Sequence, residues 1–226
     1  MPQPSCIILG GPNGSGKTSA FAKLNLDGVW VNADEIARAL PGSGGGKSRE
    51  RRASEIVLRQ LSELVGARQP FVFEATLSSR HSINLMSRAK AAGFLVGLYY
   101  VALDDVETNI ERVRQRVLKG GHDIPETVIR ERYKRSLDNL AEALRLADEV
   151  LLIDNSAIQP HEVIRISSGE VKASAIDEGK ELHRLFSAKV CEAYALVHLD
   201  GGFKTTGPIR PVQNSPTHDA EPDAEE

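Results

Sequence analysis

Short apolar segments alternate with longer amphipathic segments along most of the chain. The apolar segments cover residues 6–9, 28–32, 70–76, 94–103 and 149–154. The amphipathic segments, whose apolar positions recur at helical spacing, cover residues 48–67, 79–92, 106–118 and 127–147. Buried strands that alternate with helices are typical of a parallel sheet. The pattern therefore predicts an α/β fold, in which a five-stranded parallel sheet carries helices on both faces.

A different pattern follows the fifth apolar segment. Residues 162–166 and 170–173 flank a Ser-Ser-Gly turn, which predicts a small hairpin, and a helix is expected from residue 175 towards residue 199. The stretch from residue 208 onward is rich in Pro, Asp and Glu and poor in large apolar residues, as disordered segments are. We therefore expect a core over residues 1–160, a C-terminal hairpin and helix packed on it over residues 161–200, and a disordered acidic tail over residues 201–226.

A glycine-rich loop follows the first apolar segment. Residues 11–18 read GPNGSGKT and fit the phosphate-binding pattern GxxxxGKS/T at every fixed position. The apolar run before them and the helical pattern after them supply the strand, loop and helix that this motif requires. Glycines let successive backbone N–H groups turn toward phosphate oxygens at the positive end of the helix. The loop predicts a nucleoside triphosphate site and the P-loop nucleoside triphosphate hydrolase fold.

Two residues of this loop have an expected chemical role. The Lys17 ammonium would contact the β- and γ-phosphates, and the Thr18 hydroxyl would be a ligand of Mg²⁺. ATP and Mg²⁺ are therefore the expected cofactors. The residues expected to bind the nucleotide are Gly11, Pro12, Asn13, Gly14, Ser15, Gly16, Lys17, Thr18, Ser19 and Asn155.

Four carboxylates follow strands of the predicted sheet, at the edge where ligands bind in open α/β folds. They are Asp34, Glu74, Asp104 and Asp154. Transfer of a phosphoryl group to a hydroxyl needs a carboxylate that orients the acceptor and takes its proton. Asp34 is the candidate for this role, with a helix N-cap as the alternative. The apolar run before Glu74 delivers this carboxylate directly to the ligand-binding edge, with an exposed carboxylate at a strand end as the alternative.

The other two carboxylates have separate interpretations. Asp104, together with Asp105, is expected to cap the helix that follows. Asp154 ends an apolar run, like the metal-holding Asp of many P-loop ATPases. The next residue, Asn155, is not the glutamate that activates water in motor ATPases, and the chain has no LSGGQ-like sequence. A transport-type ATPase is therefore disfavoured.

Basic residues are concentrated in residues 112–135, where two amphipathic segments are joined by a Gly-Gly pair. Two Arg-bearing helices on a glycine hinge predict a mobile lid that closes over ATP and excludes water. Most of these arginines are expected to form a solvated charged face. The candidates for contact with the phosphates are Arg116, nearest the hinge, and Arg132 or Arg135.

Composition limits the partners of the chain. Its 28 basic and 31 acidic residues give a net charge of −3, so no general affinity for nucleic acid or for an anionic membrane is indicated. The two cysteines have no spacing suited to a disulfide framework or a zinc site. No basic segment leads into a long apolar one, and no stretch approaches membrane-spanning length. A soluble, cytoplasmic protein is expected.

Together, these segments resemble the zeta-toxin family of P-loop kinases. The matching pieces, in the family's order, are GGPNGSGKT at 10–18, NADEIA at 32–37, FEATLSS at 73–79, RVRQRVLKGGHDIPETVIRERYKRSLDNL at 112–140 and DEVLLIDNS at 148–156. The GGHDIPE stretch and the helix after it are the most specific of these. The long GGxxIPE version of the lid and the PNGS in the loop make the chain look more like the chromosomal branch of the family.

The resemblance implies a function and roles for single residues. It implies a kinase that uses ATP and Mg²⁺ to phosphorylate a sugar hydroxyl of a nucleotide sugar such as UDP-N-acetylglucosamine. It also implies an antitoxin partner that blocks the ATP site. The catalytic residues by this likeness are Asp34 as general base, Lys17, Arg116 and Arg132; the substrate contacts are Asp34, Glu74 and Thr76; and the metal ligand is Thr18.

Two other functions stay open. A 5′-hydroxyl polynucleotide kinase would share this kind of core and an Arg-rich lid, although the acidic net charge and the aromatic content of 5% speak against a nucleic-acid channel. A nucleotide-dependent binding module would bind ATP and transfer nothing. Transfer of labelled phosphate to an acceptor separates these functions.

Overall fold

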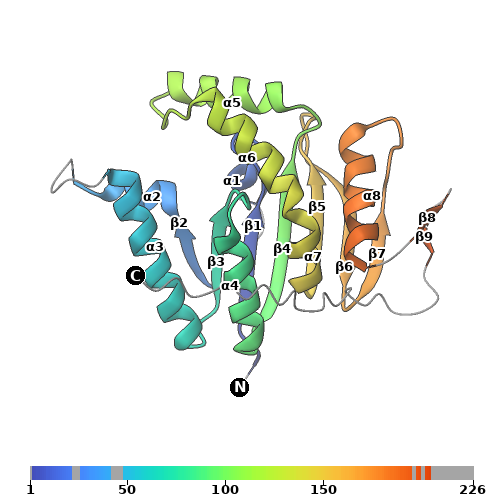
Figure 1. Cartoon of the computed structure of the whole chain (residues 1–226), viewed down its shortest axis with the longest axis horizontal. Coiled ribbons are helices and arrows are strands. Elements are labelled where there is room, and N and C mark those ends of the chain that lie inside the picture. The colour runs from blue at the N-terminus through green and yellow to red at the C-terminus, as the bar shows by residue number, and fades with distance from the viewer. Residues whose placement is uncertain (1, 22–25, 42–47, 195–196, 200–201, 205–226) are drawn as a thin grey trace, which may run out of the picture.

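The computed structural model describes residues 2–21, 26–41, 48–194, 197–199 and 202–204 (Figure 1). The strands of its main sheet are β1 (Ser5–Gly10), β2 (Val29–Asn32), β3 (Phe71–Ala75), β4 (Leu95–Ala102), β5 (Glu149–Asp154), β6 (His161–Ser167) and β7 (Glu170–Ser174). They lie in the order β2-β3-β1-β4-β5-β6-β7, and β1 to β5 are parallel to one another. The α/β fold and its five parallel strands are therefore confirmed.

The C-terminal hairpin is part of this sheet. Strand β6 pairs with β5 in the antiparallel sense, and β7 pairs with β6. Because β6 covers the open edge of β5, the backbone N–H and C=O groups of β5 have partners on both sides. Ile164 and Ile166 of β6 are fully buried and continue the apolar face of β5. The parallel sheet predicted from the sequence is thus extended by two antiparallel strands.

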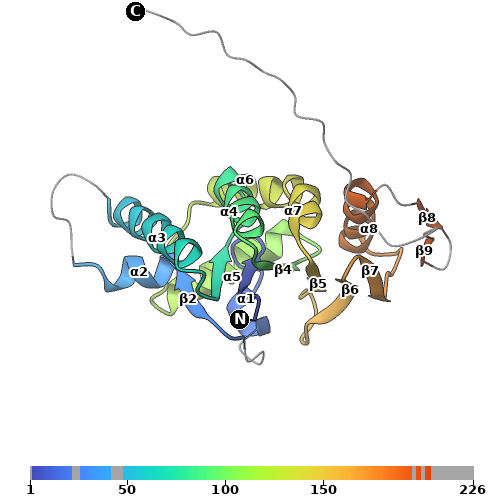
Figure 2. The same cartoon turned by 90° about the horizontal axis from the view of Figure 1, so that it is seen from below.

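The helices form a layer on each face of the sheet. They are α1 (Lys17–Phe21), α2 (Ala33–Ala39), α3 (Arg49–Gly66), α4 (Arg80–Ala91), α5 (Val106–Leu118), α6 (Glu126–Asp138), α7 (Leu140–Leu146) and α8 (Glu181–Tyr194). Helices α3, α4, α7 and α8 lie side by side on one face, and α1 lies on the other (Figure 2). Helices α5 and α6 arch over the carboxyl ends of the strands. Within the described ranges, no helix combines the length and the apolar character that crossing a membrane requires.

Three predicted boundaries differ from the structure. The helix expected from residue 175 towards residue 199 is the shorter α8, and residues 197–199 form a strand. The helix expected over residues 127–147 is two helices, α6 and α7, separated at Asn139, whose side-chain amide donates to the Leu77 carbonyl at 2.9 Å. The disordered tail expected over residues 201–226 lies almost wholly outside the described residues. Its described part, Gly202–Lys204, forms strand β9, which pairs with β8 (Val197–Leu199).

The main core lies between the sheet and the layer of α3, α4, α7 and α8. Phe71 and Tyr100 from the strands pack there with Phe186 of α8, and all three are fully buried. The rings of Tyr100 and Phe186 meet edge to face, with centroids 6.0 Å apart. Burial of one such side chain contributes about 1.5–3 kcal/mol to folding. Helix α8 is therefore part of the core that supports the sheet.

Asp154, at the end of β5, joins the sheet to α8. Its side chain is 1% exposed and accepts hydrogen bonds from Lys180 Nζ at 2.7 Å and His183 Nε2 at 3.2 Å. The Asp177 N–H donates to His183 Nδ1, so the proton of that ring is assigned to Nε2. Burial raises the pKa of Asp154, but the hydrogen bonds from Lys180 and Ser156 outweigh it and lower the pKa to about 2. These contacts give Asp154 a structural role. It therefore differs from the metal-holding Asp of many P-loop ATPases, which it resembles in its position at the end of a strand.

Asp154→Asn should destabilise the fold by about 1–2 kcal/mol at neutral pH. A carboxyl group whose pKa is depressed by folding stabilises the folded state above its unfolded pKa. The difference in unfolding free energy between parent and variant should therefore be full above about pH 4 and should disappear as the pH falls through about 2. Urea unfolding at several pH values measures it, with the exposed Asp123→Asn as control. A difference that stays constant with pH would contradict this role for Asp154.

Candidate active site

The loop between β1 and α1 depends on two glycines. Gly11 has a φ of +139° and Gly16 a φ of +83°, both in the left-handed region that favours glycine. A Cβ on Gly11 would collide with the Val101 carbonyl oxygen, and a Cβ on Gly16 would collide with the side-chain nitrogen of Asn155. The loop therefore lies tightly against β4 and against the residue that follows β5.

Three side chains hold this loop from outside. Asn109 of α5 donates from Nδ2 to the Asn13 carbonyl at 2.6 Å, and Asn155 donates from Nδ2 to the Ser15 carbonyl at 2.7 Å. Arg132 of α6 donates to Asn13 Oδ1 at 3.3 Å. The sequence analysis included Asn155 and Arg132 but missed Asn109, which is fully buried. An asparagine beside the apolar stripe of an amphipathic helix was the available signal.

Lys17 is folded back onto the loop. Its side chain donates to the carbonyls of Gly11 at 2.8 Å and Pro12 at 3.1 Å, and the residue is 7% exposed. Burial lowers the pKa of Lys17, the nearby carboxylates of Glu74 and Asp34 oppose that shift, and Arg116 and Arg132 add to it. A phosphate that takes the place of these carbonyls would give the ammonium an anionic partner.

Thr18 and Glu74 form the oxygen-rich part of the site. The Thr18 hydroxyl donates to Glu74 Oε2 at 3.0 Å, and Asn32 Nδ2 donates to the same oxygen at 2.9 Å. Glu74 reaches Thr18 because β3 lies directly beside β1. Hydroxyl and carboxylate oxygens are the ligands that Mg²⁺ prefers, so Thr18 and Glu74 fit this ion. Within the described residues, no group of three or more His, Cys, Asp or Glu could hold a metal, so phosphate oxygens would complete the coordination.

Asp34 does not cap a helix. The N-cap of α2 is Asn32, whose Oδ1 accepts from the N–H groups of Asp34 at 2.8 Å and Glu35 at 3.2 Å. The Asp34 side chain is exposed, and its carboxylate forms no hydrogen bond or ion pair with another described residue. The N-cap alternative is therefore wrong, and the carboxylate is accessible to a ligand. Asp105 does cap α5, as expected, whereas Asp104 accepts from the Leu182 N–H at the start of α8.

The arginines of the lid fall into two groups. The outer ones are paired with carboxylates: Arg114 with Glu126 at 3.0 Å, Arg130 with Glu107 at 2.5 Å, and Arg135 with Glu131 at 2.8 Å. The inner ones form no ion pair with any described carboxylate and donate to carbonyl or amide oxygens instead; they are Arg112, Arg116 and Arg132. Of the two alternatives for the second lid helix, Arg132 therefore reaches the loop and Arg135 does not.

The Gly-Gly turn of the lid is packed against Arg116. The guanidinium of Arg116 donates to the His122 carbonyl at 3.1 Å, and its Nε is buried without a partner among the described residues. A Cβ on Gly121 would press on the side chain and the carbonyl of Arg116, whereas Gly120, at a φ of +84°, has open space around it. The turn thus holds the Arg116 guanidinium in place between α5 and residues 120–122.

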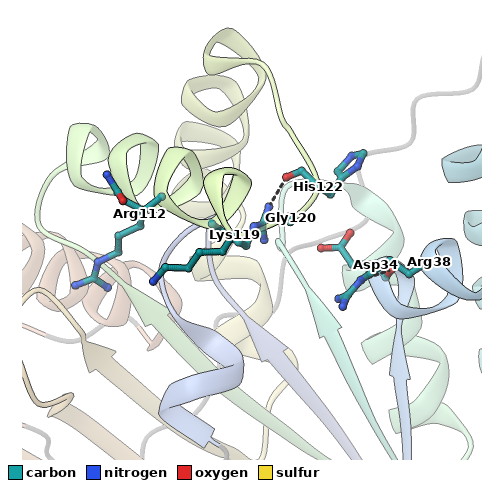
Figure 3. Close-up of a pocket in the computed structure, with 9 residues that line it drawn as sticks. Asp34, Arg38, Arg112, Lys119, Gly120 and His122 are labelled. Atoms are coloured by element: carbon teal, nitrogen blue, oxygen red, sulfur yellow. Dashed lines mark hydrogen bonds between the residues drawn. The ribbon is translucent and has the colours of Figure 1, made fainter.

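Two cavities of about 500 Å³ each share Asp34 and His122 as lining residues. The first lies between α2 and α5 and is strongly basic, because Arg38, Arg112, Arg116 and Lys119 line it. Figure 3 shows Asp34 and Arg38 projecting from α2 on one side of this cavity, with Arg112 of α5 and Lys119, its C-cap residue, on the other. The sequence analysis missed Arg38, which stands one helical turn after Asp34.

The second cavity lies between the glycine-rich loop, α3 and the start of α4. Its apolar wall is formed by Ala53, Val57, Leu58 and Phe73. Its polar residues include Lys17, Asp34, Glu74, Thr76, Ser78 and Arg132. Thr76 and Ser78 share a hydrogen bond of 2.7 Å between their hydroxyls. The structure thus brings six of the predicted site residues to one cavity (Asn13, Lys17, Asp34, Glu74, Thr76 and Arg132), and it places Arg116 in the basic cavity beside it.

Gly16→Ala should weaken ATP binding by about 10- to 100-fold, because a residue forced into a left-handed conformation is strained and the new methyl would displace Asn155. Gly66→Ala is the matched control, since a Cβ at that position has no neighbour within 4 Å. Calorimetric titration with a non-hydrolysable ATP analogue measures both. Equal affinities for the two variants would show that the loop tolerates the side chain.

Comparisons with known proteins agree with this architecture. A family model described as "AAA domain" matches residues 6–143, which is more than half of the chain. A protein of Haemophilus influenzae, described only as an uncharacterized protein, is 33% identical over 136 residues, which are 58% of this chain and 94% of that protein. Similarity therefore centres on the part of the chain that carries the loop, the strands and the lid.

Two solved structures share the fold. A chain of the AvrRxo1-ORF1:-ORF2 complex with ATP superposes with a TM-score of 0.63 at 20% identity, over 82% of this chain and 63% of that one. A chain of the PezAT chromosomal toxin–antitoxin system of Streptococcus pneumoniae superposes with a TM-score of 0.54 at 16% identity, over 85% and 87%. The chain thus spans 63% of the length of the AvrRxo1 chain that it matches. The fold is shared with chains of the AvrRxo1-ORF1:-ORF2 complex and of the PezAT system, and the chain belongs to the AAA domain family.

Proposed function

We propose that this protein is an ATP-dependent kinase that transfers the γ-phosphate to a hydroxyl of a small molecule, with a nucleotide sugar such as UDP-N-acetylglucosamine as the acceptor. The observation that carries the proposal is the meeting of two cavities at Asp34. One is basic, as a triphosphate requires. The other is lined by Asn13 and Lys17 of the phosphate loop and has an apolar wall with hydroxyl and carboxylate groups. An unpaired carboxylate between donor and acceptor is the arrangement that phosphoryl transfer uses.

Different residues have different roles in the proposed transfer. Lys17 and the loop N–H groups bind the triphosphate, and Arg116 and Arg132 neutralise charge on the moving phosphoryl group. Asp34 accepts the proton of the acceptor hydroxyl while that oxygen attacks the γ-phosphorus. The bond from phosphorus to the β,γ-bridging oxygen breaks, ADP leaves with its electron pair, and the proton stays on Asp34 until solvent removes it. Closure of the lid would exclude water as a competing acceptor.

Magnesium has a place in this scheme. The Thr18 hydroxyl would hold the ion. Glu74, which accepts a hydrogen bond of 3.0 Å from that hydroxyl, would orient it. When bound, the ion supplies positive charge to the phosphate oxygens.

The acceptor cavity supports a sugar-containing substrate. Phe73 and the apolar side chains of α3 offer a surface for the carbon face of a ring, and Thr76, Ser78 and Glu74 offer hydrogen bonds to hydroxyls. A volume of about 500 Å³ lies in the range of small-molecule sites. On the likeness of fold to a toxin–antitoxin system alone, we also propose a protein partner of the antitoxin kind. Such a partner should compete with ATP for the basic cavity.

Asp34→Asn should leave ATP affinity nearly unchanged and lower the rate of transfer by about 100- to 10,000-fold, the range that a general base contributes. The asparagine keeps the shape of the side chain but cannot take the proton. The measurement is the appearance of label on UDP-N-acetylglucosamine incubated with γ-labelled ATP. Glu35→Gln, on the next residue of the same helix, is the control. Equal transfer rates for parent and Asp34→Asn would remove Asp34 as the base.

The choice of acceptor is tested in the same assay. A panel of nucleotide sugars, free sugars, a 5′-hydroxyl oligonucleotide and a metabolite extract is offered to the parent protein, and the labelled product is identified by mass. Label on the oligonucleotide alone would replace the proposal with a polynucleotide kinase. Tight ATP binding with no labelled product would favour a nucleotide-dependent binding module.

Glu74→Gln should raise the Mg²⁺ concentration needed for half-maximal binding of an ATP analogue by about tenfold or more, because the group that orients the metal ligand loses its charge. The acceptor KM tests the alternative role of Glu74. A raised KM with an unchanged Mg²⁺ requirement would assign the carboxylate to the substrate and not to the metal. Thr76→Val, which removes a hydroxyl of the acceptor cavity away from Thr18, is the control for the Mg²⁺ dependence.

A further inference from the structure

The basic cavity contains more positive charge than the lid supplies. Arg112 and Arg116 come from α5, and Lys119 is the C-cap residue of that helix; the fourth cation, Arg38, comes from α2 on the opposite wall (Figure 3). None of the four forms an ion pair with a described carboxylate, whereas the outer arginines Arg114 and Arg130 do. Unpaired cations gathered around one cavity repel one another, and an anionic ligand relieves that repulsion.

Arg38 is held in a defined orientation. It stands four residues after Asp34, so the two side chains lie on the same face of α2. Its Nε donates to the Asp34 carbonyl at 3.2 Å. No described residue accepts a hydrogen bond from its two Nη groups, which carry four of the five donors of a guanidinium. These donors are therefore available to a ligand in the cavity that Asp34 also lines.

We propose that Arg38 is a catalytic residue that contacts the transferred phosphoryl group from the side of the acceptor. The proposal rests on the proposed function and deepens it. The base must come close to a hydroxyl that attacks an anionic phosphoryl group, so the carboxylate and the phosphoryl oxygens repel each other. A guanidinium on the same helix face offsets this repulsion and moves together with the base. Arg116 and Arg132 would act on the phosphoryl group from the lid, and Arg38 from α2.

A structural role for Arg38 makes a different prediction. A cation in the last turn of a short helix also stabilises the helix C-terminus. In that case, removal of Arg38 would lower the melting temperature and would affect every ligand equally. A catalytic contact instead affects the transition state more strongly than bound ATP.

The test compares Arg38→Ala, Arg38→Lys and the control Arg114→Ala, which breaks an outer ion pair of the lid. Two probes are titrated with Mg²⁺ present: a non-hydrolysable ATP analogue, and ADP with aluminium fluoride, which mimics the phosphoryl group in flight. Arg38→Ala should bind the ATP analogue within about threefold of the parent. It should bind ADP with aluminium fluoride about 10- to 100-fold more weakly, the loss of one charged hydrogen bond. Arg38→Lys should recover part of this loss, and Arg114→Ala should match the parent with both probes.

Kinetics provide a second readout that separates this proposal from the proposed function. With a labelled acceptor, or with water as the acceptor, Arg38→Ala should lower kcat by about 100-fold with little change in KM. The proposal is overturned if kcat and the aluminium fluoride affinity both match the parent, or if both probes lose affinity equally together with a lower melting temperature. If the parent phosphorylates no added acceptor while binding of aluminium fluoride still depends on Arg38, the proposed function fails and the phosphoryl contact of Arg38 stands.

Discussion

Parallel pairing of β1 with β3 on one side and with β4 on the other determines where each group of the site lies. The three strands end at the same edge of the sheet, so the glycine-rich loop, Glu74 and the start of α5 are gathered there. The fit of Gly11 against the β4 backbone and of Gly16 against Asn155 then holds the loop in a curled conformation. A phosphate that binds to such a loop orders little additional backbone, and less of its binding energy is lost to entropy.

Charge pairing separates the outer arginines of the lid from the inner arginines that face the candidate site. Outer arginines such as Arg114 and Arg130 have carboxylate partners, and exposed pairs of this kind contribute little to stability. Arg112, Arg116 and Arg132 point inward and donate only to uncharged oxygens. Together with Lys17, whose pKa is lowered by burial, they form a cluster of positive charge that an anionic ligand would neutralise. A triphosphate has the charge and the length that such a site accommodates.

The C-terminal elements contribute to the same site without a recognisable motif. Strand β6 covers the edge of β5, and Lys180 and His183 of the α8 region bind Asp154 at its end. The next residue, Asn155, donates to the Ser15 carbonyl of the phosphate loop. One peptide bond therefore connects a buried structural carboxylate to the amide that supports the nucleotide loop. A loss of packing around α8 would be transmitted to the loop through this short path.

The sequence by itself determined the α/β class, the five parallel strands, the phosphate loop, and Asp34 and Glu74 as strand-end carboxylates, because these depend on local periodicity and on a contiguous motif. Only the tertiary structure decided that Glu74 contacts Thr18, that Arg132 and not Arg135 reaches the loop, that Asn109 holds the loop, and that Arg38 lines the basic cavity. Each of these facts depends on which elements lie side by side. An arginine or an asparagine has the same local signature on a solvated face and in a cavity, and its role comes from neighbours far away in the sequence.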